Sequence, residues 1–99
     1  MSEAVPDEVV HQTTRLRILA ALEAEPGAKP LDFVRLKGVT DATDGNLGAH
    51  LATLEKAGYV EVEKEPVGKR FRTLVSLTEP GRAAFLAHLA FLKAIVGQR

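Results

Sequence analysis

Apolar residues recur every three or four positions over the first quarter of the chain, and polar residues fill the positions between them. Over residues 7–25 the apolar positions are Val9, Val10, Leu16, Ile18, Leu19, Ala20 and Leu22. This spacing predicts a helix that buries one face, with a break near Thr13 and Thr14. The helix must end before Pro26, because proline disfavours helical backbone at the residue that precedes it.

Two more helices are expected over residues 32–57. Asp32 can accept hydrogen bonds from the free amide groups at the start of a short helix, and Thr43 can do the same for a longer one. The short helix is expected to bury Phe33, Leu36 and Val39. In the longer helix, apolar residues repeat at i, i+4 and i+7, at Leu47, Leu51 and Leu54. This repeat leaves the polar face of the longer helix toward solvent.

The hydrophobic pattern changes to alternation over residues 59–77. In YVEVEKE apolar residues alternate with glutamates, and in RFRTLVSL Phe71 stands between Arg70 and Arg72. The residues PVGK between the two segments are typical of a turn. Two alternating segments on either side of a turn predict a β-hairpin.

The last segment, residues 79–97, is apolar around most of its circumference. Thr78 is a suitable N-cap for a helix here, and Pro80 is tolerated in the first turn. One stripe of this helix consists of Phe85, Leu89, Leu92 and Val96. One small domain cannot cover every face of such a helix, so the pattern predicts a homodimer in which this helix packs against a second copy.

Length and composition narrow the class of protein. The chain has 99 residues, of which 45% are hydrophobic and 26% charged, which predicts one globular domain over residues 1–99. It has no cysteine, which excludes disulfides, cysteine-ligated zinc and a cysteine nucleophile. The acidic N-terminus has no signal-peptide layout, and no apolar stretch is long enough to cross a bilayer. We therefore expect a soluble cytoplasmic protein with no membrane partner.

The sequence offers no residue set that suggests a cofactor, a metal site or a catalytic centre. Residues 40–46, TDATDGN, resemble a calcium-binding loop. No register, however, places oxygen ligands, glycine and a bidentate glutamate at the positions that such a loop needs. There is also no glycine-rich phosphate loop and no histidine pair at metal spacing. The prediction is a protein that is not an enzyme and binds no cofactor.

Positive charge is concentrated in the predicted hairpin, although the whole chain is neutral. The 13 Lys and Arg residues balance 13 Asp and Glu residues. Between residues 64 and 72, Glu65 stands alone against the cations Lys64, Lys69, Arg70 and Arg72. A cluster of this kind can bind phosphate groups.

Helices, a basic hairpin and a last helix follow one another in the order of a winged helix-turn-helix. The motifs RLRILAAL, LDFVRLK, TDGNLGAHLATLEKAGYVEVEK, VGKRFRT and LTEPGRAAF strongly resemble small bacterial and archaeal winged-helix regulators related to the MarR and ArsR types. The resemblance covers roughly residues 8–96. It implies a mainly helical fold with a small β-hairpin, that is, a winged helix-turn-helix domain with extra terminal helices.

Regulators of this type usually bind double-stranded DNA as homodimers, with the third helix in the major groove and the hairpin along the backbone or minor groove. The candidate DNA-binding residues are Thr43, Asn46, Gly48, Ala49, His50, Thr53, Lys69, Arg70 and Arg72. Asn46 can pair with adenine, and His50 can donate to a phosphate or to guanine. The expected function is sequence-specific transcriptional regulation by a homodimeric repressor, because a bare dimeric domain acts most simply by occluding a promoter.

Each candidate residue also has a purely structural interpretation. Thr43 and Asn46 can cap a helix, His50 can cover the adjoining apolar face, and a basic hairpin can protect a sheet edge. For the whole chain, the alternative function is a winged-helix protein-interaction module or a subunit of a larger assembly. The neutral net charge and the small residues Gly48 and Ala49 favour this alternative. A small apolar effector that binds between the first and last helices of a dimer is a further alternative that the sequence leaves open.

Overall fold

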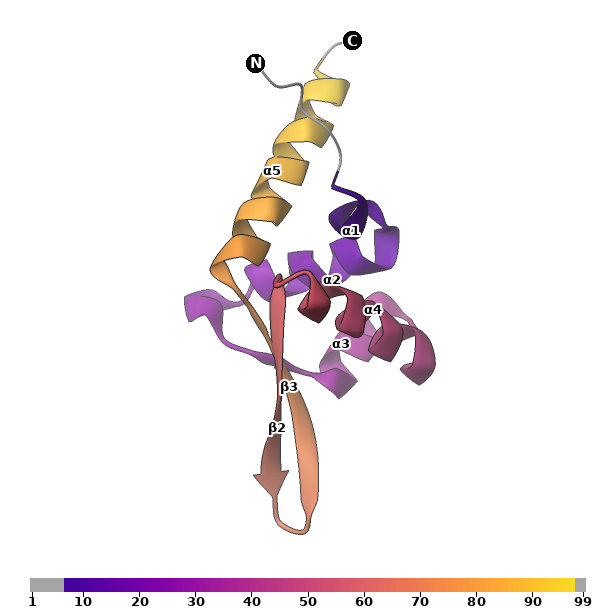
Figure 1. Ribbon diagram of the computed structural model, residues 1–99, viewed down its shortest axis with the longest axis vertical. Helices are drawn as coiled ribbons and strands as arrows, with labels where there is room; N and C mark the ends of the chain where they lie inside the picture. The colour runs from indigo at the N-terminus through magenta and orange to yellow at the C-terminus, as the bar shows by residue number, and fades with distance from the viewer. Residues whose placement is uncertain (1–6, 98–99) are drawn as a thin grey trace.

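The computed structural model describes residues 7–97, and helices gather at one end of a small antiparallel sheet whose hairpin projects from them (Figure 1). In chain order the elements are α1 (Glu8–His11), α2 (Thr13–Glu23), the 3-10 turn η1 (Pro26–Ala28), β1 (Leu31–Asp32), α3 (Phe33–Thr40), α4 (Asp44–Lys56), β2 (Val60–Val67), β3 (Arg70–Leu77) and α5 (Glu79–Val96). The predicted fold class, mainly helical with a β-hairpin and extra terminal helices, is confirmed.

Three helices begin at the capping residues that the sequence predicts. The side chains of Asp32, Thr43 and Thr78 each accept a hydrogen bond from the amide three residues further on, at 2.8, 3.1 and 3.0 Å respectively. Such bonds satisfy amide groups that have no partner within the helix. The starts of α3, α4 and α5 are therefore fixed by local sequence.

The predicted helix over residues 7–25 is divided into α1 and α2 at Gln12, whose backbone is extended (φ −66°, ψ 131°). The carboxylate of Asp7 caps α1, and the side chain of Gln12 accepts a hydrogen bond from the amide of Arg15 at 2.9 Å. The break thus lies where a second capping side chain starts a new helix. The sequence pattern places it one or two residues later.

The sheet has three strands, where the sequence predicts only the two of the hairpin. β1 pairs with β3, and β3 pairs with β2, both antiparallel. β1 has two residues, which is too short for an alternating pattern to be visible. β2 and β3 pair from Val60 and Leu77 to Val67 and Arg70, and Gly68 in the tight turn has φ +62°. A positive φ at this place favours glycine.

The core lies where α2, α3 and α4 meet the sheet. Its buried residues include Ile18, Leu19, Leu22, Leu36, Leu47, Leu51, Leu54, Val60 and Val75. The leucine stripe of α4 is buried as predicted. Val39 differs from the prediction, since it is 49% exposed. Thr40 takes the inward position in the last turn of α3, where its hydroxyl donates to the carbonyl of Leu36 at 2.8 Å.

α5 and the hairpin extend in opposite directions from the body, which makes the molecule 54 Å long and 25 by 24 Å across (Figure 1). The early turns of α5 pack on the body, so Phe85, expected at a dimer interface, is only 5% exposed and belongs to the core of its own chain. Further along, Leu86, Ile95 and Val96 are 40, 49 and 65% exposed. This later part of α5 carries the uncovered apolar surface.

Candidate nucleic-acid interface

The outer face of α4 presents most of the residues that the sequence singles out for DNA contact. Because the leucine stripe faces the core, the opposite face of the helix is open to solvent. The exposed candidates are Thr43, Asn46, Gly48, Ala49 and Thr53. Thr43 also caps the helix, so its hydroxyl is already used as an acceptor.

An ion pair changes the charge at the start of α4. Asp44 lies in the first turn, where its carboxylate would repel a DNA phosphate from the free amides of the helix. Lys37 of α3 places its Nζ 2.7 Å from a carboxylate oxygen of Asp44. The pair is exposed, and it offsets the negative charge at this helix end.

Sequence reasoning misses Lys37 as a site residue. The turn between α3 and α4 decides whether the two side chains meet, and it contains Asp41 in the left-handed conformation (φ 56°). Residue spacing alone does not reveal this geometry. An acid at a helix start and a lysine on the preceding helix were the only available signals.

His50 is half-buried and bonded to a residue far away in the sequence. Its Nδ1 lies 3.1 Å from Nη1 of Arg15, in the first turns of α2. Arg15 is held in place by the carbonyls of α1, since its Nε donates to Val9 at 2.6 Å and its Nη2 to Glu8 at 3.3 Å. Burial lowers the pKa of His50 below its ordinary value, and the charge of Arg15 lowers it further. Both effects favour the neutral form of the His50 ring.

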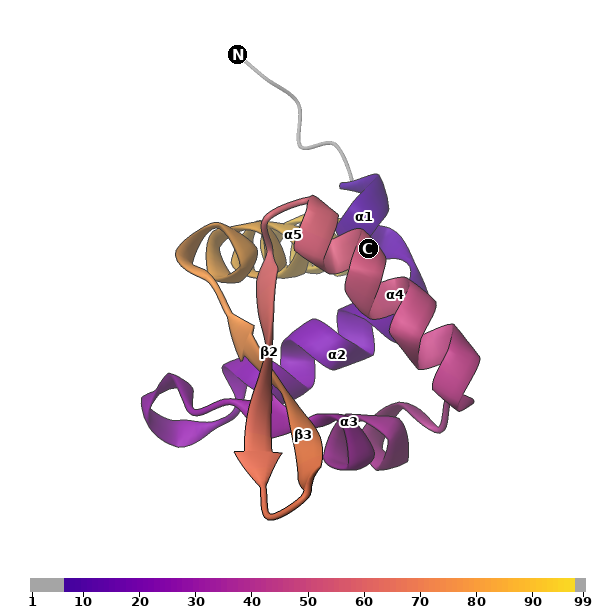
Figure 2. The same ribbon diagram turned by 60° about the horizontal axis from the view of Figure 1, so that its bottom comes forward.

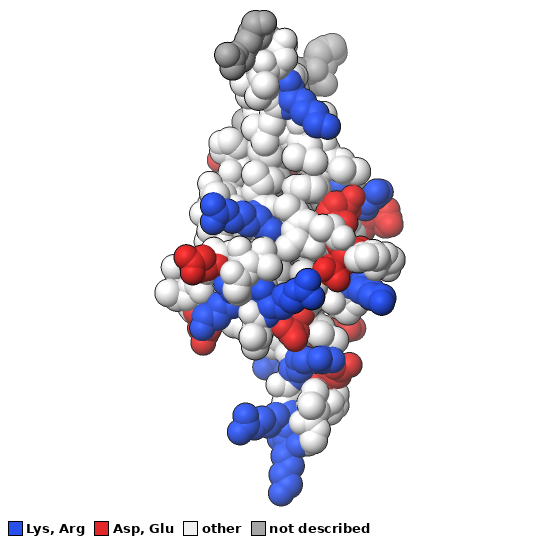
Figure 3. All heavy atoms as spheres, turned by 180° about the vertical axis from the view of Figure 1, so that it is seen from behind, with Lys and Arg blue, Asp and Glu red and all other residues white. Residues whose placement is uncertain are grey.

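The hairpin carries cations at its tip, but they are not equivalent. Lys69 and Arg70 are exposed, and neither forms an ion pair with any residue in the range 7–97. Arg72 instead binds the carboxylate of Glu65 on the neighbouring strand, with Nε 3.0 Å from Oε1. Figure 3 shows lysine and arginine atoms at the tip of the hairpin, whereas both charges are mixed over the rest of that face.

α3 connects the two candidate surfaces, because it contacts both α4 and β3 (Figure 2). An open groove of about 530 Å³ lies between the start of α3 and the hairpin. Its lining is mostly apolar and includes Phe33, Val34, Val67 and Phe71, with Arg70 at its edge. Phe71 is 68% exposed. The groove thus adjoins the cationic tip.

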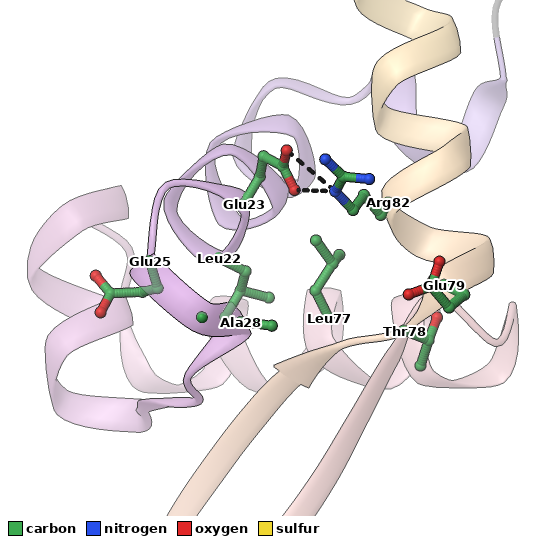
Figure 4. A pocket seen from close by; sticks show the side chains of 9 residues that line it. Leu22, Glu23, Glu25, Ala28, Leu77, Thr78, Glu79 and Arg82 are labelled. Carbon is green, nitrogen blue, oxygen red and sulfur yellow. Dashed lines mark hydrogen bonds and ion pairs between the residues drawn. The ribbon is translucent and has the colours of Figure 1, made fainter.

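A second hollow, of about 230 Å³, lies between the end of α2 and the start of α5 (Figure 4). Glu23, Glu25 and Glu79 line it, and Arg82 bonds to Glu23 at 3.0 Å. With its one arginine already paired to a carboxylate, this acidic hollow would repel a phosphate backbone. It is therefore not part of the nucleic-acid interface.

None of the helices in the range 7–97 combines the length and the apolar character that a bilayer span requires. In the same range, no three His, Asp or Glu side chains are grouped so that they could hold a metal ion.

Comparison with known proteins agrees with this geometry. A family model described as a winged helix DNA-binding domain matches residues 14–96 of the chain. The chain belongs to the winged helix DNA-binding domain family. In this family context, α2, α3 and α4 form the helical part of the winged helix and β2 and β3 form its wing.

The relatives of this winged helix domain include regulators from several organisms. An uncharacterized protein of Methanocaldococcus jannaschii is 37% identical over 78 residues, which is 79% of this chain and 82% of the relative. The structure of a transcriptional regulator homologue from Pyrococcus horikoshii is similar with a TM-score of 0.84 and 28% identity, covering 96% of this chain and 91% of that one.

Two further structures correspond to the types named from the sequence. A MarR family regulator from Silicibacter pomeroyi has a TM-score of 0.68 and 25% identity, covering 88% of this chain but 56% of its own. A protein described as a possible transcriptional regulator for arsenical resistance has a TM-score of 0.62 and 25% identity, with 93% of each chain covered. The predicted relation to MarR-type and ArsR-type regulators is confirmed.

Family membership sets the class of function. The winged helix domain of this chain is a DNA-binding domain similar to transcriptional regulators, so DNA is its partner. The prediction that the protein is not an enzyme is confirmed on the same basis.

Proposed function

We propose that the chain is a sequence-specific regulator of transcription that binds double-stranded DNA as a homodimeric repressor. One observation carries the proposal: a winged helix domain presents an exposed polar face on α4, and the tip of its wing carries cations that form no ion pair with residues 7–97. In this proposal α4 enters the major groove, and the wing follows the phosphate backbone. Asn46 and His50 read base edges, while Lys69 and Arg70 supply salt-dependent affinity.

The smaller residues of α4 define how closely the helix can approach DNA. Gly48 has no atom within 4 Å of the place where a Cβ would lie, so nothing but backbone covers this position. Ala49 offers a methyl group that can contact the methyl group of thymine. Thr53 donates its hydroxyl proton to the carbonyl of Ala49 at 3.2 Å, which leaves the hydroxyl oxygen as an acceptor for an amino group of a base.

In this proposal Arg72 contributes less to phosphate binding than Lys69 and Arg70 do. Its guanidinium is bonded to Glu65, so a phosphate would have to compete with a carboxylate for it. The candidate DNA-binding set therefore divides into a reading face on α4, free cations at Lys69 and Arg70, and a partly neutralised cation at Arg72.

The dimer rests on the later turns of α5. Leu86, Ile95 and Val96 are exposed there, and Leu89 and Leu92 are half-buried. A second copy that packs its α5 against this surface would remove these side chains from water. It would also give the dimer two recognition helices, which must lie roughly 34–36 Å apart to enter successive major grooves on one side of the duplex.

Repression is the simplest output of such a dimer, because a domain bound at a promoter blocks access to it directly. Occupying a promoter needs no additional surface. The cytoplasmic location is part of the same proposal, since it follows from DNA as the partner. A small effector between the first and last helices would act only through different affinities for the DNA-competent and incompetent states.

The neutral net charge supports a second candidate function, a winged-helix module that binds another protein. An electrophoretic mobility shift assay with genomic fragments at 100 mM salt separates the two candidates. The regulator should retain a subset of fragments against excess non-specific DNA, and the interaction module should retain none. Sedimentation of the free chain at micromolar concentration should give a dimer; a monomer alone would contradict the dimeric form of the proposal.

A further inference from the structure

We propose that Arg15 is a positioning residue for base recognition: it fixes the proton of the His50 ring on Nε2, so that His50 presents a hydrogen-bond donor to DNA. This inference rests on the proposed function, in which the outer face of α4 reads base edges. It adds a residue of α2, outside the recognition helix and the wing, to the determinants of sequence preference.

The first step is the identity of the donor. An arginine guanidinium carries N–H groups and no acceptor. In the 3.1 Å contact between Arg15 Nη1 and His50 Nδ1, the proton therefore belongs to arginine, and Nδ1 accepts it with its lone pair. A neutral imidazole whose Nδ1 is unprotonated has its proton on Nε2.

The second step is the rigidity of Arg15. Its guanidinium makes three hydrogen bonds at once: to His50, to the carbonyl of Val9 at 2.6 Å and to the carbonyl of Glu8 at 3.3 Å. Because α1 supplies two of the acceptors, the side chain cannot swing toward solvent without breaking contacts on both sides. Arg15 thus holds one orientation of the His50 ring as well as one tautomer.

The third step is the accessibility of Nε2. This atom makes no hydrogen bond with residues 7–97. In that range, the side-chain polar atom that is both fully buried and without a partner is Nδ1 of His88, not Nε2 of His50. Nε2 therefore has no partner among these residues and is not fully buried. Asn46 precedes His50 by one helical turn, so both side chains rise from the same side of α4.

The fourth step is the charge of the ring. Burial and the adjacent guanidinium both lower the pKa of His50, so the ring approaches DNA as a neutral donor. A fixed donor selects among bases, because guanine offers two acceptors in the major groove while cytosine offers only its amino group. The other tautomer would have the opposite preference. Arg15 therefore makes His50 favour guanine and reject cytosine at the base that it faces.

Nitrogen-15 NMR of the histidine rings tests the claim that Arg15 fixes the tautomer of His50. It uses the free protein, without DNA. Wild type should show His50 in the single Nε2–H tautomer, and both Arg15→Met and Arg15→Ala should show a mixture. Arg15→Lys, which retains a donor, should restore the single tautomer. Arg17→Ala is the matched control, since it removes an exposed cation of the same helix that makes no hydrogen bond or ion pair within the described residues. An unchanged His50 spectrum in both the Met and Ala variants would overturn the inference.

Competition binding tests the claim that Arg15 sets the base preference of His50. The duplexes differ at the one base pair where the His50→Ala variant loses the preference that wild type shows. Wild type should favour guanine over cytosine there by roughly 5- to 150-fold, the fold-change that corresponds to the usual cost of one mismatched base pair. Arg15→Met should lose most of this ratio, and it should have no further effect in a His50→Ala background. Binding with an unchanged ratio in Arg15→Met would refute the role of Arg15 and leave the proposed function standing. A wild-type protein that binds no duplex would instead refute the proposed function and the base reading together.

Discussion

The unequal cations of the wing lead to a prediction about salt dependence. Each phosphate contact that a protein makes contributes about 0.9 to the slope of log affinity against log salt concentration. Lys69 and Arg70 are exposed and form no ion pair within residues 7–97, so each is free to bind one phosphate. Each substitution removes two cations from the proposed homodimer, so replacing both residues with alanine should lower the slope by about 3.6, at any DNA sequence.

For the single Arg70→Ala variant, which removes two contacts from the homodimer, the slope should change by about 1.8. Raising the salt from 50 to 200 mM should then reduce its affinity about 12-fold less than it reduces that of wild type. Arg72→Ala should change the slope by clearly less, because Glu65 already neutralises that arginine. Glu65→Ala should have the opposite effect: it releases Arg72 in both protomers and should steepen the slope by up to about 1.8.

Fluorescence anisotropy with one labelled duplex, titrated at several salt concentrations, measures these slopes. Arg17→Ala is the control, since this exposed arginine lies on α2, outside both the wing and the proposed dimer interface on α5. An unchanged slope in the double variant would refute the placement of the wing on the backbone. A flatter slope in Glu65→Ala would refute the neutralising role of that carboxylate.

Three further predictions concern stability. Gly81→Ala should lower the free energy of unfolding in urea by about 3 kcal/mol, because a Cβ there would lie 2.0 Å from the carbonyl oxygen of Tyr59. Gly48→Ala should raise it by about 0.5–1 kcal/mol, because the space around Gly48 is open. Equal effects of the two substitutions would contradict the packing described. Tyr59→Phe removes the 2.6 Å hydrogen bond from the phenol to the Asp7 carboxylate, and a thermal melt should show a loss of about 1.5 kcal/mol rather than none. The folded chain holds the pKa of His50 below the ordinary 6.5, so the unfolded chain binds its proton first. The free energy of unfolding should therefore rise with pH up to about 6.5 and then level off. His50→Gln should remove the part of this rise that comes from His50. An unchanged pH profile in His50→Gln would count against the lowered pKa.

Local sequence was sufficient to predict the helices and the hairpin, because their signals lie within a few residues of one another. A cap such as Thr43 bonds to an amide three residues away, and the leucine stripe of α4 follows from helical geometry alone. β1 was missed for the converse reason. Its two residues form a strand only because β3, more than forty residues later, supplies the hydrogen-bond partners.

The candidate site shows the same division. Exposure of Asn46 follows from the face of α4 on which it lies. The bond between Arg15 and His50 joins residues 35 positions apart, and no periodicity in either helix indicates it. The pairing of Arg72 with Glu65 depends on strand register, which places the two directly opposite each other across the hairpin. Contacts of this kind follow from the assembled fold, so sequence patterns identified the residues but not their partners.

Selection of bound sequences from random duplex DNA tests the central claim most directly, because it asks at once for DNA binding, base preference and two-fold symmetry. At about 100 mM salt, the account predicts an enriched site made of two inverted half-sites whose centres lie roughly 10–10.5 base pairs apart, each with a guanine at one fixed position. A pool that remains random after repeated rounds, or an enriched site without two-fold symmetry, would contradict the reading of operator DNA by a homodimer.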